Sequence, residues 1–150
     1  MSVMGFMGRY EHTLDAKGRI FIPVKYRAAL AIGCIVCPAF HHKCLWIFTL
    51  EDFETLAQKL GGFSLLDRDA AMVEGFLFQN AADAEMDAQG RLTLSHEHRR
   101  FADLTRDVIL AGTRNRIEVW DKAAYALNLP NVDDHFKEVI AGLNQRGIRI

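Results

Sequence analysis

The chain has 150 residues, of which 50% are hydrophobic and 25% charged, with a formal net charge of −1. This is the profile of an ordinary globular protein that forms one compact domain or two small packed units. No apolar run approaches the ~20 residues of a membrane span. The N-terminal residues lack the basic and long apolar stretches of a secretory signal. We therefore expect a cytoplasmic protein with reduced cysteines and no membrane partner.

The charge is distributed unevenly along the sequence. Residues 1–30 hold five bases and two acids, a net charge of +3, whereas residues 31–83 hold three bases and seven acids, a net charge of −4. A local basic patch beside an acidic body can attract a polyanion such as nucleic acid, even when the whole chain is nearly neutral. Charges scattered over a solvated surface would give the same totals, so charge alone leaves both interpretations open.

A pentapeptide of the form Asp-Ala-x-Gly-Arg occurs twice, as DAKGR at residues 15–19 and as DAQGR at residues 87–91. The same offset of 72 residues aligns the segments that follow without a gap, RIFI with RLTL and LWIF with IEVW. A period of this length is too long for a solenoid repeat. We interpret it as the internal duplication of a small αβ unit.

The first copy begins with an alternating segment from Tyr10 to Asp15 that leads into a turn. Gly18 can adopt the positive φ that a tight turn needs, and Asp15 can accept hydrogen bonds from backbone N–H groups two residues further on. A short strand follows, and the same sequence pattern recurs in the second copy. Each pentapeptide is therefore predicted to be a turn that delivers its arginine to the first residue of a strand.

The strand after each turn places its two aliphatic residues on one face. The arginine and the residue two positions later then lie on the other face, because side chains alternate along a strand. Arg19 and Phe21 form this second face in the first copy, and Arg91 and Thr93 form it in the second. We expect the two arginines to point outward from paired turns at the same end of the molecule.

A short helix is predicted after each strand, over residues 24–30 with Pro23 in its first turn and over residues 96–101 with Ser95 as its N-cap. The later elements of the two copies are β-segments at 34–39 and 45–48, a helix at 50–60, β-segments at 107–111 and 117–120, and a helix at 122–129. An amphipathic helix at 66–80 separates the copies, and a last helix is predicted at 133–143.

These elements predict a β-rich α+β chain in which two duplicated units pack as one body, since no low-complexity linker separates them. The predicted organisation is a first unit at 5–60, a connecting helix at 61–80, a second unit at 81–130, and a C-terminal helix and tail at 131–150. Phe48 and its matching residue Trp120 are expected to anchor the core.

Cys34, Cys37, His41 and Cys44 have the residue types of a tetrahedral zinc site. Two observations argue against it. Strand positions three apart point to opposite faces, and the positions that match the three cysteines in the second copy hold two arginines and an isoleucine, so the duplicated architecture needs no metal there. We predict no metal and no cofactor, and keep a zinc-binding sensor as a less favoured alternative.

The run SHEH at residues 95–98 contains the residue types of a catalytic triad. Adjacent residues of a helix do not face one another, whereas a triad needs its three groups to meet in space. We therefore expect exposed helix residues, no enzymatic activity and no small-molecule substrate.

Four stretches carry a resemblance to a known family: GRYEHTLDAKGRIFIP, WIFTLEDFETLAQKL, GFLFQNAADAEMDAQGRLTL and RIEVWDKAAY. Together they resemble MraZ, a family of bacterial transcriptional regulators, over roughly residues 5–126. The resemblance implies tandem AbrB-like units, of the swapped-hairpin or double-split βαβ kind, related by a pseudo-twofold axis. It also implies assembly into rings, commonly octameric, and binding to repeated boxes in the promoter of the family's own division and cell-wall gene cluster.

The resemblance further implies that Arg19 and Arg91 read DNA, and that Arg27 and Arg99 contact it from the helices that follow. An arginine can donate two hydrogen bonds in a fixed fork to one guanine, which makes it the commonest specific base contact. The complete set of candidate DNA-binding residues is Arg19, Arg91, Lys17, Gln89, Arg27 and Arg99.

The two turns differ at one position of this set. Lys17 is expected on a phosphate, because an ammonium group acts as a point charge. Gln89 at the matching position supplies no charge, so the second turn is expected to hold phosphate less strongly.

The duplicated arginines and the resemblance together imply a sequence-specific regulator of the division and cell-wall gene cluster, including its own promoter, that is cytoplasmic and nucleoid-associated. The main alternative is a ring-forming assembly protein whose turns make subunit contacts instead of DNA contacts. We expect a homo-oligomer in either case, since burial between subunits would explain the outward-facing Phe21 and the broad apolar surface of the helix at 66–80.

Overall fold

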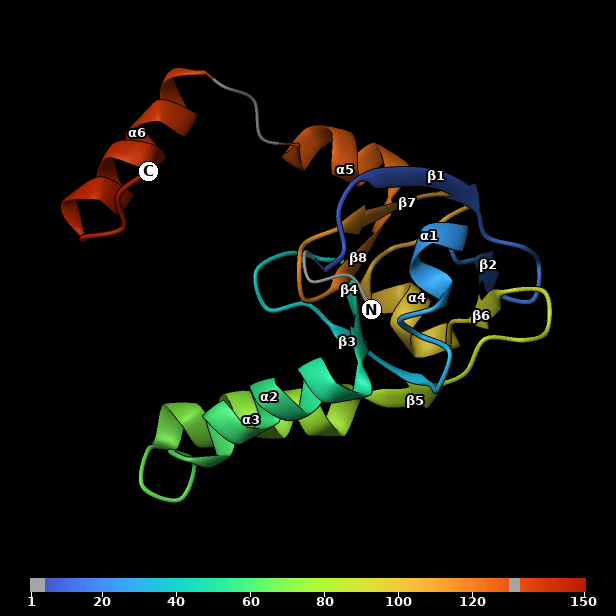
Figure 1. Ribbon diagram of the computed structural model, residues 1–150, viewed down its shortest axis with the longest axis horizontal. Helices are drawn as coiled ribbons and strands as arrows, with labels where there is room; N and C mark the ends of the chain where they lie inside the picture. The colour runs from blue at the N-terminus through green and yellow to red at the C-terminus, as the bar shows by residue number, and fades with distance from the viewer. Residues whose placement is uncertain (1–4, 130–132) are drawn as a thin grey trace.

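The computed structural model describes residues 5–129 and 133–150 (Figure 1). Its elements in chain order are β1 (Arg9–Thr13), β2 (Arg19–Phe21), α1 (Val24–Arg27), β3 (Cys34–Pro38), β4 (Leu45–Thr49), α2 (Leu50–Gly61), α3 (Arg68–Asn80), β5 (Ala82–Ala84), β6 (Arg91–Thr93), α4 (His96–Phe101), β7 (Asp107–Gly112), β8 (Ile117–Asp121), α5 (Lys122–Asn128) and α6 (Asp134–Gln145). The prediction of a β-rich α+β chain is confirmed. The predicted boundary at 130/131 lies outside the described residues.

Six strands form one antiparallel sheet in the order β1-β7-β8-β4-β3-β5, and β2 pairs with β6 in a separate two-stranded sheet. A shift of 72 residues places β1 on β5, β3 on β7 and β4 on β8. Exchanging the two copies therefore gives the same strand order, read from the other edge of the sheet. The first strand of each copy pairs with the third strand of the other, β1 with β7 and β5 with β3. The two copies therefore share one sheet, whose topology has twofold symmetry about the β4–β8 pair.

The shared sheet is covered on both faces. One face packs against the two-stranded sheet through Ile20, Ile22, Leu92 and Leu94, each at most 1% exposed. Full burial of such a side chain contributes about 1.5–3 kcal/mol. Together the four side chains fix the two-stranded sheet to the body. The opposite face packs against α2, α3 and α5 around a second, aromatic cluster.

The aromatic cluster is organised around one carboxylate. Phe48 and Trp120 are 2% and 4% exposed, so the prediction that they anchor the core is confirmed. Glu118 accepts hydrogen bonds from the indole N–H of Trp46 at 3.1 Å and from that of Trp120 at 3.0 Å. Glu118 is the residue of the second copy that matches Trp46, and it lies directly opposite Trp46 across the β4–β8 pair. The twofold symmetry of the sheet is therefore broken at its centre by a polar contact.

The first helix is shorter than predicted. The helix predicted over 24–30 stops at Arg27, because the chain tightens into successive four-residue turns in which Leu30 N–H bonds to Arg27 O and Gly33 N–H bonds to Leu30 O. Pro23 stands at the N-cap of this helix and not within its first turn.

α3 begins later than predicted, because Asp67 is its N-cap and accepts hydrogen bonds from the N–H groups of Asp69 and Ala70. Leu66 therefore lies outside the helix, where it is 98% exposed. α2 and α3 pack side by side as a hairpin that projects from the sheet, and α6 lies apart from the body (Figure 1). Within the described ranges, no helix is both long and apolar enough to cross a membrane.

Replacing Glu118 by alanine should lower the free energy of unfolding by about 1–3 kcal/mol, the cost of leaving a buried donor without its acceptor. Glu118→Gln should lose less, since the amide keeps an oxygen that can accept from one indole. Urea unfolding of both variants would measure this difference. Equal loss in the two variants would show that the carboxylate does not organise the cluster.

Candidate nucleic-acid interface

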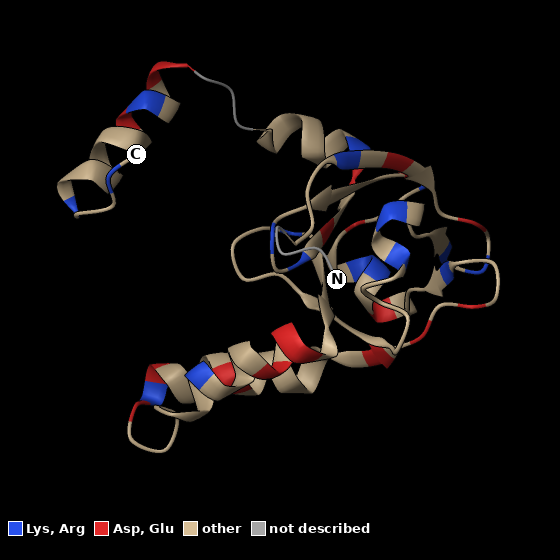
Figure 2. Cartoon of the chain, viewed as in Figure 1, with Lys and Arg blue, Asp and Glu red and all other residues tan. Residues whose placement is uncertain are grey.

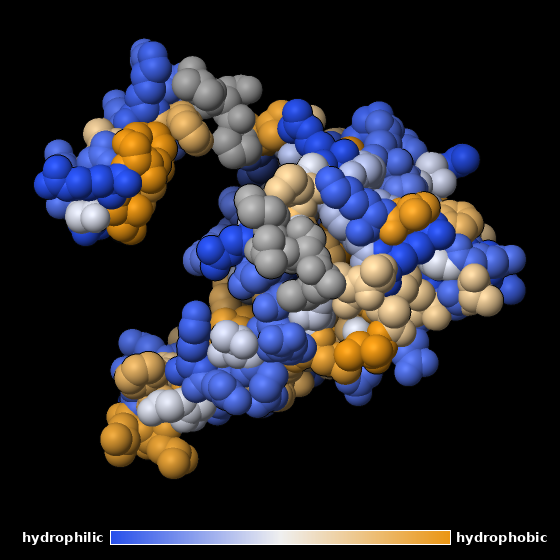
Figure 3. All heavy atoms as spheres, viewed as in Figure 1, coloured by the Kyte–Doolittle hydropathy of each residue, from blue (hydrophilic) through white to orange (hydrophobic). Residues whose placement is uncertain are grey.

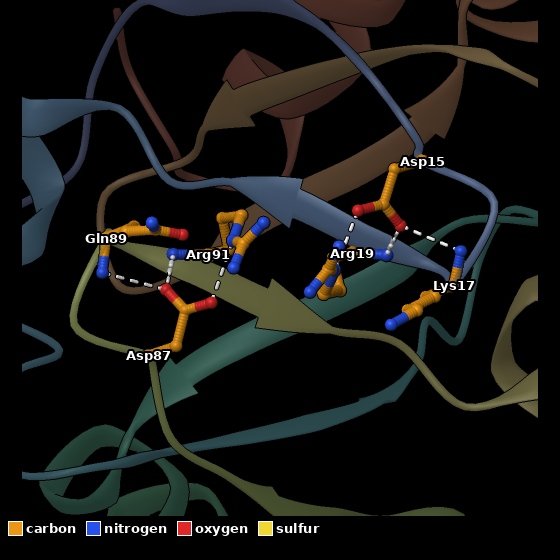
Figure 4. A network of polar contacts seen from close by, with 6 residues as sticks. All are labelled: Asp15, Lys17, Arg19, Asp87, Gln89 and Arg91. Carbon is orange, nitrogen blue, oxygen red and sulfur yellow. Dashed lines mark hydrogen bonds and ion pairs between the residues drawn. The ribbon is translucent and has the colours of Figure 1, made fainter.

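The two pentapeptides meet on the two-stranded sheet. In its antiparallel register the opposing pairs are Arg19 and Thr93, Ile20 and Leu92, and Phe21 and Arg91. Ile20 and Leu92 are fully buried beneath it, so the flanking positions face outward. Arg19 and Arg91 are therefore diagonal neighbours on one outward face (Figure 4), and Cα atoms in such a diagonal pair are typically about 7–8 Å apart. The prediction that both arginines lie at the same end of the molecule is confirmed.

Each arginine is held by the aspartate of its own turn. Asp15 Oδ1 accepts the backbone N–H groups of Lys17 and Arg19 at 2.9 Å each, and Oδ2 accepts the Nε–H of Arg19 at 2.7 Å. Asp87 repeats this pattern around Arg91 with distances of 3.0, 2.9 and 2.8 Å (Figure 4). Within the part of the chain that the structure describes, the terminal Nη groups of both arginines have no hydrogen-bond partner, so these donors remain available to a ligand.

The same hydrogen bonds lower the pKa of Asp15 and Asp87. The largest cause is the bond from the backbone N–H of Arg19 or Arg91, which favours the ionised carboxylate. Because the pKa of each carboxyl is lower in the folded protein than in the unfolded chain, ionisation of the two aspartates stabilises the fold fully above the normal carboxyl pKa. This stabilisation is lost only as the pH falls through the lower, folded-state pKa. Both ion pairs are therefore fully formed at neutral pH.

Arg27 and Arg99 each pack against the turn of the other copy. Each donates its Nε–H to a carbonyl oxygen five residues earlier in its own copy, at 2.8 and 3.2 Å. The guanidinium of Arg27 occupies the space that a Cβ on Gly90 would need, and Arg99 does the same at Gly18. Both glycines have positive φ, +82° and +78°. These arginines therefore shape the turns, a role that the sequence analysis did not identify because it depends on contacts between the copies.

The variable position of each turn is solvent-exposed. Lys17 and Gln89 lie at opposite ends of the paired strands, one in each turn (Figure 4). Basic residues lie on α1, α4 and the two-stranded sheet, with acidic residues in the adjoining turns, whereas the start of α2 is acidic (Figure 2). The uneven charge of the sequence is thus also uneven in space. All six candidate residues belong to this basic part of the molecule.

The cysteines do not form a metal site. Cys34 belongs to the cluster beneath the two-stranded sheet, whereas Cys37 and Cys44 belong to the aromatic cluster on the opposite face. All three are buried and free, and burial raises the pKa of Cys34 to about 11 and that of Cys37 to about 12. Among residues 5–129 and 133–150, no group of three His, Cys, Asp or Glu side chains is placed to hold a metal ion.

The prediction that both histidines of the SHEH run are exposed is wrong for His98. This residue is 7% exposed, and its Nε2 lies 2.7 Å from the carbonyl oxygen of Asn80 at the end of α3. Ser95 is the N-cap of α4, as predicted, and its hydroxyl oxygen accepts the backbone N–H of His98 at 3.1 Å. The run therefore caps and anchors a helix.

The fold and the site define a small α+β protein that is duplicated within one chain and displays a pair of arginines on a two-stranded ribbon. The family model described as "MraZ protein, putative antitoxin-like" matches residues 5–76 and again residues 77–135. The chain belongs to the MraZ family. The two successive matches confirm the duplication, and membership of a family of transcriptional regulators confirms the prediction that the chain is not an enzyme.

Curated relatives match over nearly the whole chain. "Transcriptional regulator MraZ" of Halothermothrix orenii is 32% identical over 143 residues, which cover 95% of this chain and 99% of the relative. The protein of the same name from Thermoanaerobacter pseudethanolicus is 34% identical over 142 residues, with the same coverage. That of Acetivibrio thermocellus is 38% identical over 120 residues, which cover 80% of this chain and 83% of the relative.

Gly18→Ala should lower the free energy of unfolding by about 1–2 kcal/mol, because a side chain at φ +78° is strained and a new Cβ would lie 3.0 Å from the carbonyl oxygen of Leu94. Gly142→Ala is the control. This glycine has open space around it in the interior of α6, where alanine should stabilise by about 0.5–1 kcal/mol. Thermal unfolding would compare the two variants, and equal effects would contradict the assigned role of the turn.

Proposed function

We propose that this protein is a transcriptional regulator that binds double-stranded DNA through the ribbon formed by β2 and β6. The observation that carries the proposal is the placement of Arg19 and Arg91 side by side on one exposed face, each with its Nε–H held and its terminal donors available. The names of the relatives support regulation of transcription, and the basic surroundings of the ribbon support a polyanionic partner.

The dimensions of the ribbon suit the major groove, which admits a two-stranded β-ribbon. Each guanidinium can donate two parallel hydrogen bonds to the O6 and N7 atoms of one guanine. A separation of about 7–8 Å between the two arginines corresponds to roughly two base-pair steps of 3.4 Å. The aspartates hold both arginines in place before DNA arrives, which reduces the side-chain entropy lost on binding.

The remaining candidates contribute to the phosphate contacts in this proposal. Lys17 reaches a phosphate as a point charge, and Gln89 can only donate a neutral hydrogen bond at the matching place. Arg27 and Arg99 pack their guanidinium groups against the turns, are held by their Nε–H groups, and offer their remaining N–H groups to the backbone of the duplex.

The proposed target follows from family membership. Regulators of this family are expected to act in the cytoplasm, on the nucleoid, at boxes in the promoter of their own division and cell-wall gene cluster. The units at 5–60 and 81–130 are proposed to be AbrB-like, with the exchange of first strands between copies as supporting evidence.

We also propose that the protein assembles into a homo-oligomer, of which a ring of eight is the form that family membership favours. Phe63, Leu65 and Leu66 at the tip of the α2–α3 hairpin are 67%, 95% and 98% exposed. Hydrophobic side chains also lie along α6, apart from the body (Figure 3). Apolar surface that a single chain leaves uncovered in this way marks an interaction site. Subunits that engage several boxes together would raise avidity by about 10²–10⁴.

Arg19→Ala or Arg91→Ala should lose sequence preference, since each good guanine contact contributes roughly 1–3 kcal/mol of discrimination. Arg91→Ala should lose less overall affinity, because Gln89 supplies no charge beside it. Gel-shift titrations against the protein's own upstream region and a scrambled duplex would measure both effects. Arg68→Ala at the start of α3 is the control. If both variants bind as tightly and selectively as the parent, the turns are structural and an assembly protein without specific DNA binding becomes the better account.

Lys17→Ala should weaken binding to every duplex equally and reduce the slope of log affinity against log salt by about 0.9 per engaged site. Titrations of parent and variant over a range of salt concentrations would measure this. An unchanged slope would remove Lys17 from the phosphate contacts.

Leu66→Glu should shift the protein toward smaller particles in sedimentation, because a charge replaces apolar surface that association would bury. Ile32→Glu, at another exposed aliphatic residue, should leave the particle mass unchanged. Particles of only 17.0 kDa for the parent protein at micromolar concentration would contradict assembly.

A further inference from the structure

The outward face of the ribbon carries an aromatic residue that the arginines do not explain. Phe21 is 45% exposed and lies on the same strand face as Arg19, while the matching residue of the second copy is Thr93. We propose that Phe21 is a specificity-determining residue, which packs against the 5-methyl group of a thymine next to the guanine bound by Arg91. This inference rests on the proposed binding of DNA by the ribbon.

The position of Phe21 is fixed by the same packing that fixes the arginines. Its chain neighbours Ile20 and Ile22 are fully buried, which holds the backbone between them. Phe21 lies directly opposite Arg91 in the register, and the Cζ atom of Arg91 is 6.0 Å from the centre of the phenyl ring. A duplex that brings a guanine to Arg91 must therefore bring a neighbouring base edge to Phe21.

Burial by a second subunit is the competing explanation for an exposed phenylalanine. A subunit that covered Phe21 would also cover Arg91 beside it and Arg19 on the same face of β2. Base reading by the arginines and subunit burial of Phe21 thus exclude each other on this face. If the ribbon binds DNA, the surface of Phe21 is buried by DNA.

The chemistry of the major groove selects the base. Thymine presents a methyl group there, whereas cytosine presents an N4 donor and both purines present an N7 acceptor. A phenyl ring packed on those polar groups would remove water from them without replacing the hydrogen bond, which is unfavourable. Contact between a phenylalanine side chain and a thymine methyl group has no such cost and gains apolar burial.

The difference between Phe21 and Thr93 makes the ribbon asymmetric. In the register, Arg91 stands opposite Phe21, whereas Arg19 stands opposite Thr93. The two halves of one chain therefore present different chemistry despite their duplicated fold. The box read by one chain should be asymmetric, with an aromatic contact in only one of its halves.

The test uses the full chain and the duplex box that it enriches from a randomised pool. Each thymine of that box is replaced in turn by deoxyuridine, which lacks only the methyl group. At one position beside a guanine, this replacement should lower the affinity of the parent protein about fourfold. This factor corresponds to exposing one methyl group to water. Phe21→Ser, which removes the phenyl ring and offers no methyl group, should lose this sensitivity and bind thymine and deoxyuridine boxes equally.

Phe78→Ser is the matched control, because Phe78 is a 51% exposed phenylalanine on α3, and it should keep the deoxyuridine profile of the parent. Guanine-dependent binding with no deoxyuridine effect, or an unchanged profile in Phe21→Ser, would overturn the role of Phe21 alone. Dissociation of the Phe21→Ser assembly in sedimentation would assign the residue to a subunit contact instead. Failure of the parent to enrich any box would overturn the proposed function together with this inference.

Discussion

The candidate DNA-binding surface depends on the contact that each copy makes with the turn of the other. Arg27 fills the space beside Gly90, and Arg99 fills the space beside Gly18. The residue after each short strand donates its backbone N–H to the glycine carbonyl of the other copy, at 2.9 and 2.8 Å. Neither turn is complete within its own copy. Because this contact is reciprocal, it brings the two arginines of the pentapeptides onto one ribbon, where a single copy would offer only one.

Within each turn, the aspartate contributes geometry more than stability. Asp15 and Asp87 are partly exposed, and such ion pairs add little to folding because solvent screens them. Their effect is to hold the Nε–H of each arginine and two backbone N–H groups at once. An arginine held in this way has fewer rotamers to lose when it binds a planar acceptor pair. The aliphatic residues beneath the ribbon supply the stability, and the aspartates supply the orientation.

How much of this surface could be predicted from the sequence depends on whether the interactions that form it are local or long-range along the chain. The 72-residue offset, the Asp–Gly turn and the alternation of the strands are local signals, and they were enough to place Arg19 and Arg91 together on an outward face. The exchange of strands between copies is a long-range pairing that leaves no local pattern. For that reason the packing of Arg27 and Arg99 against the opposite turns was missed, and His98 was expected in solvent although it bonds to the end of α3.

The central claim is that the two turns form one reading surface in one major groove. Methylation interference on the bound duplex tests it most directly, because methylation of guanine N7 blocks the acceptor that an arginine fork requires. Two arginines about 7–8 Å apart predict that the interfering guanines for one chain lie about two base pairs from each other in the same groove segment. Interference at guanines on separate helical turns for one chain, or none at any guanine, would contradict the account.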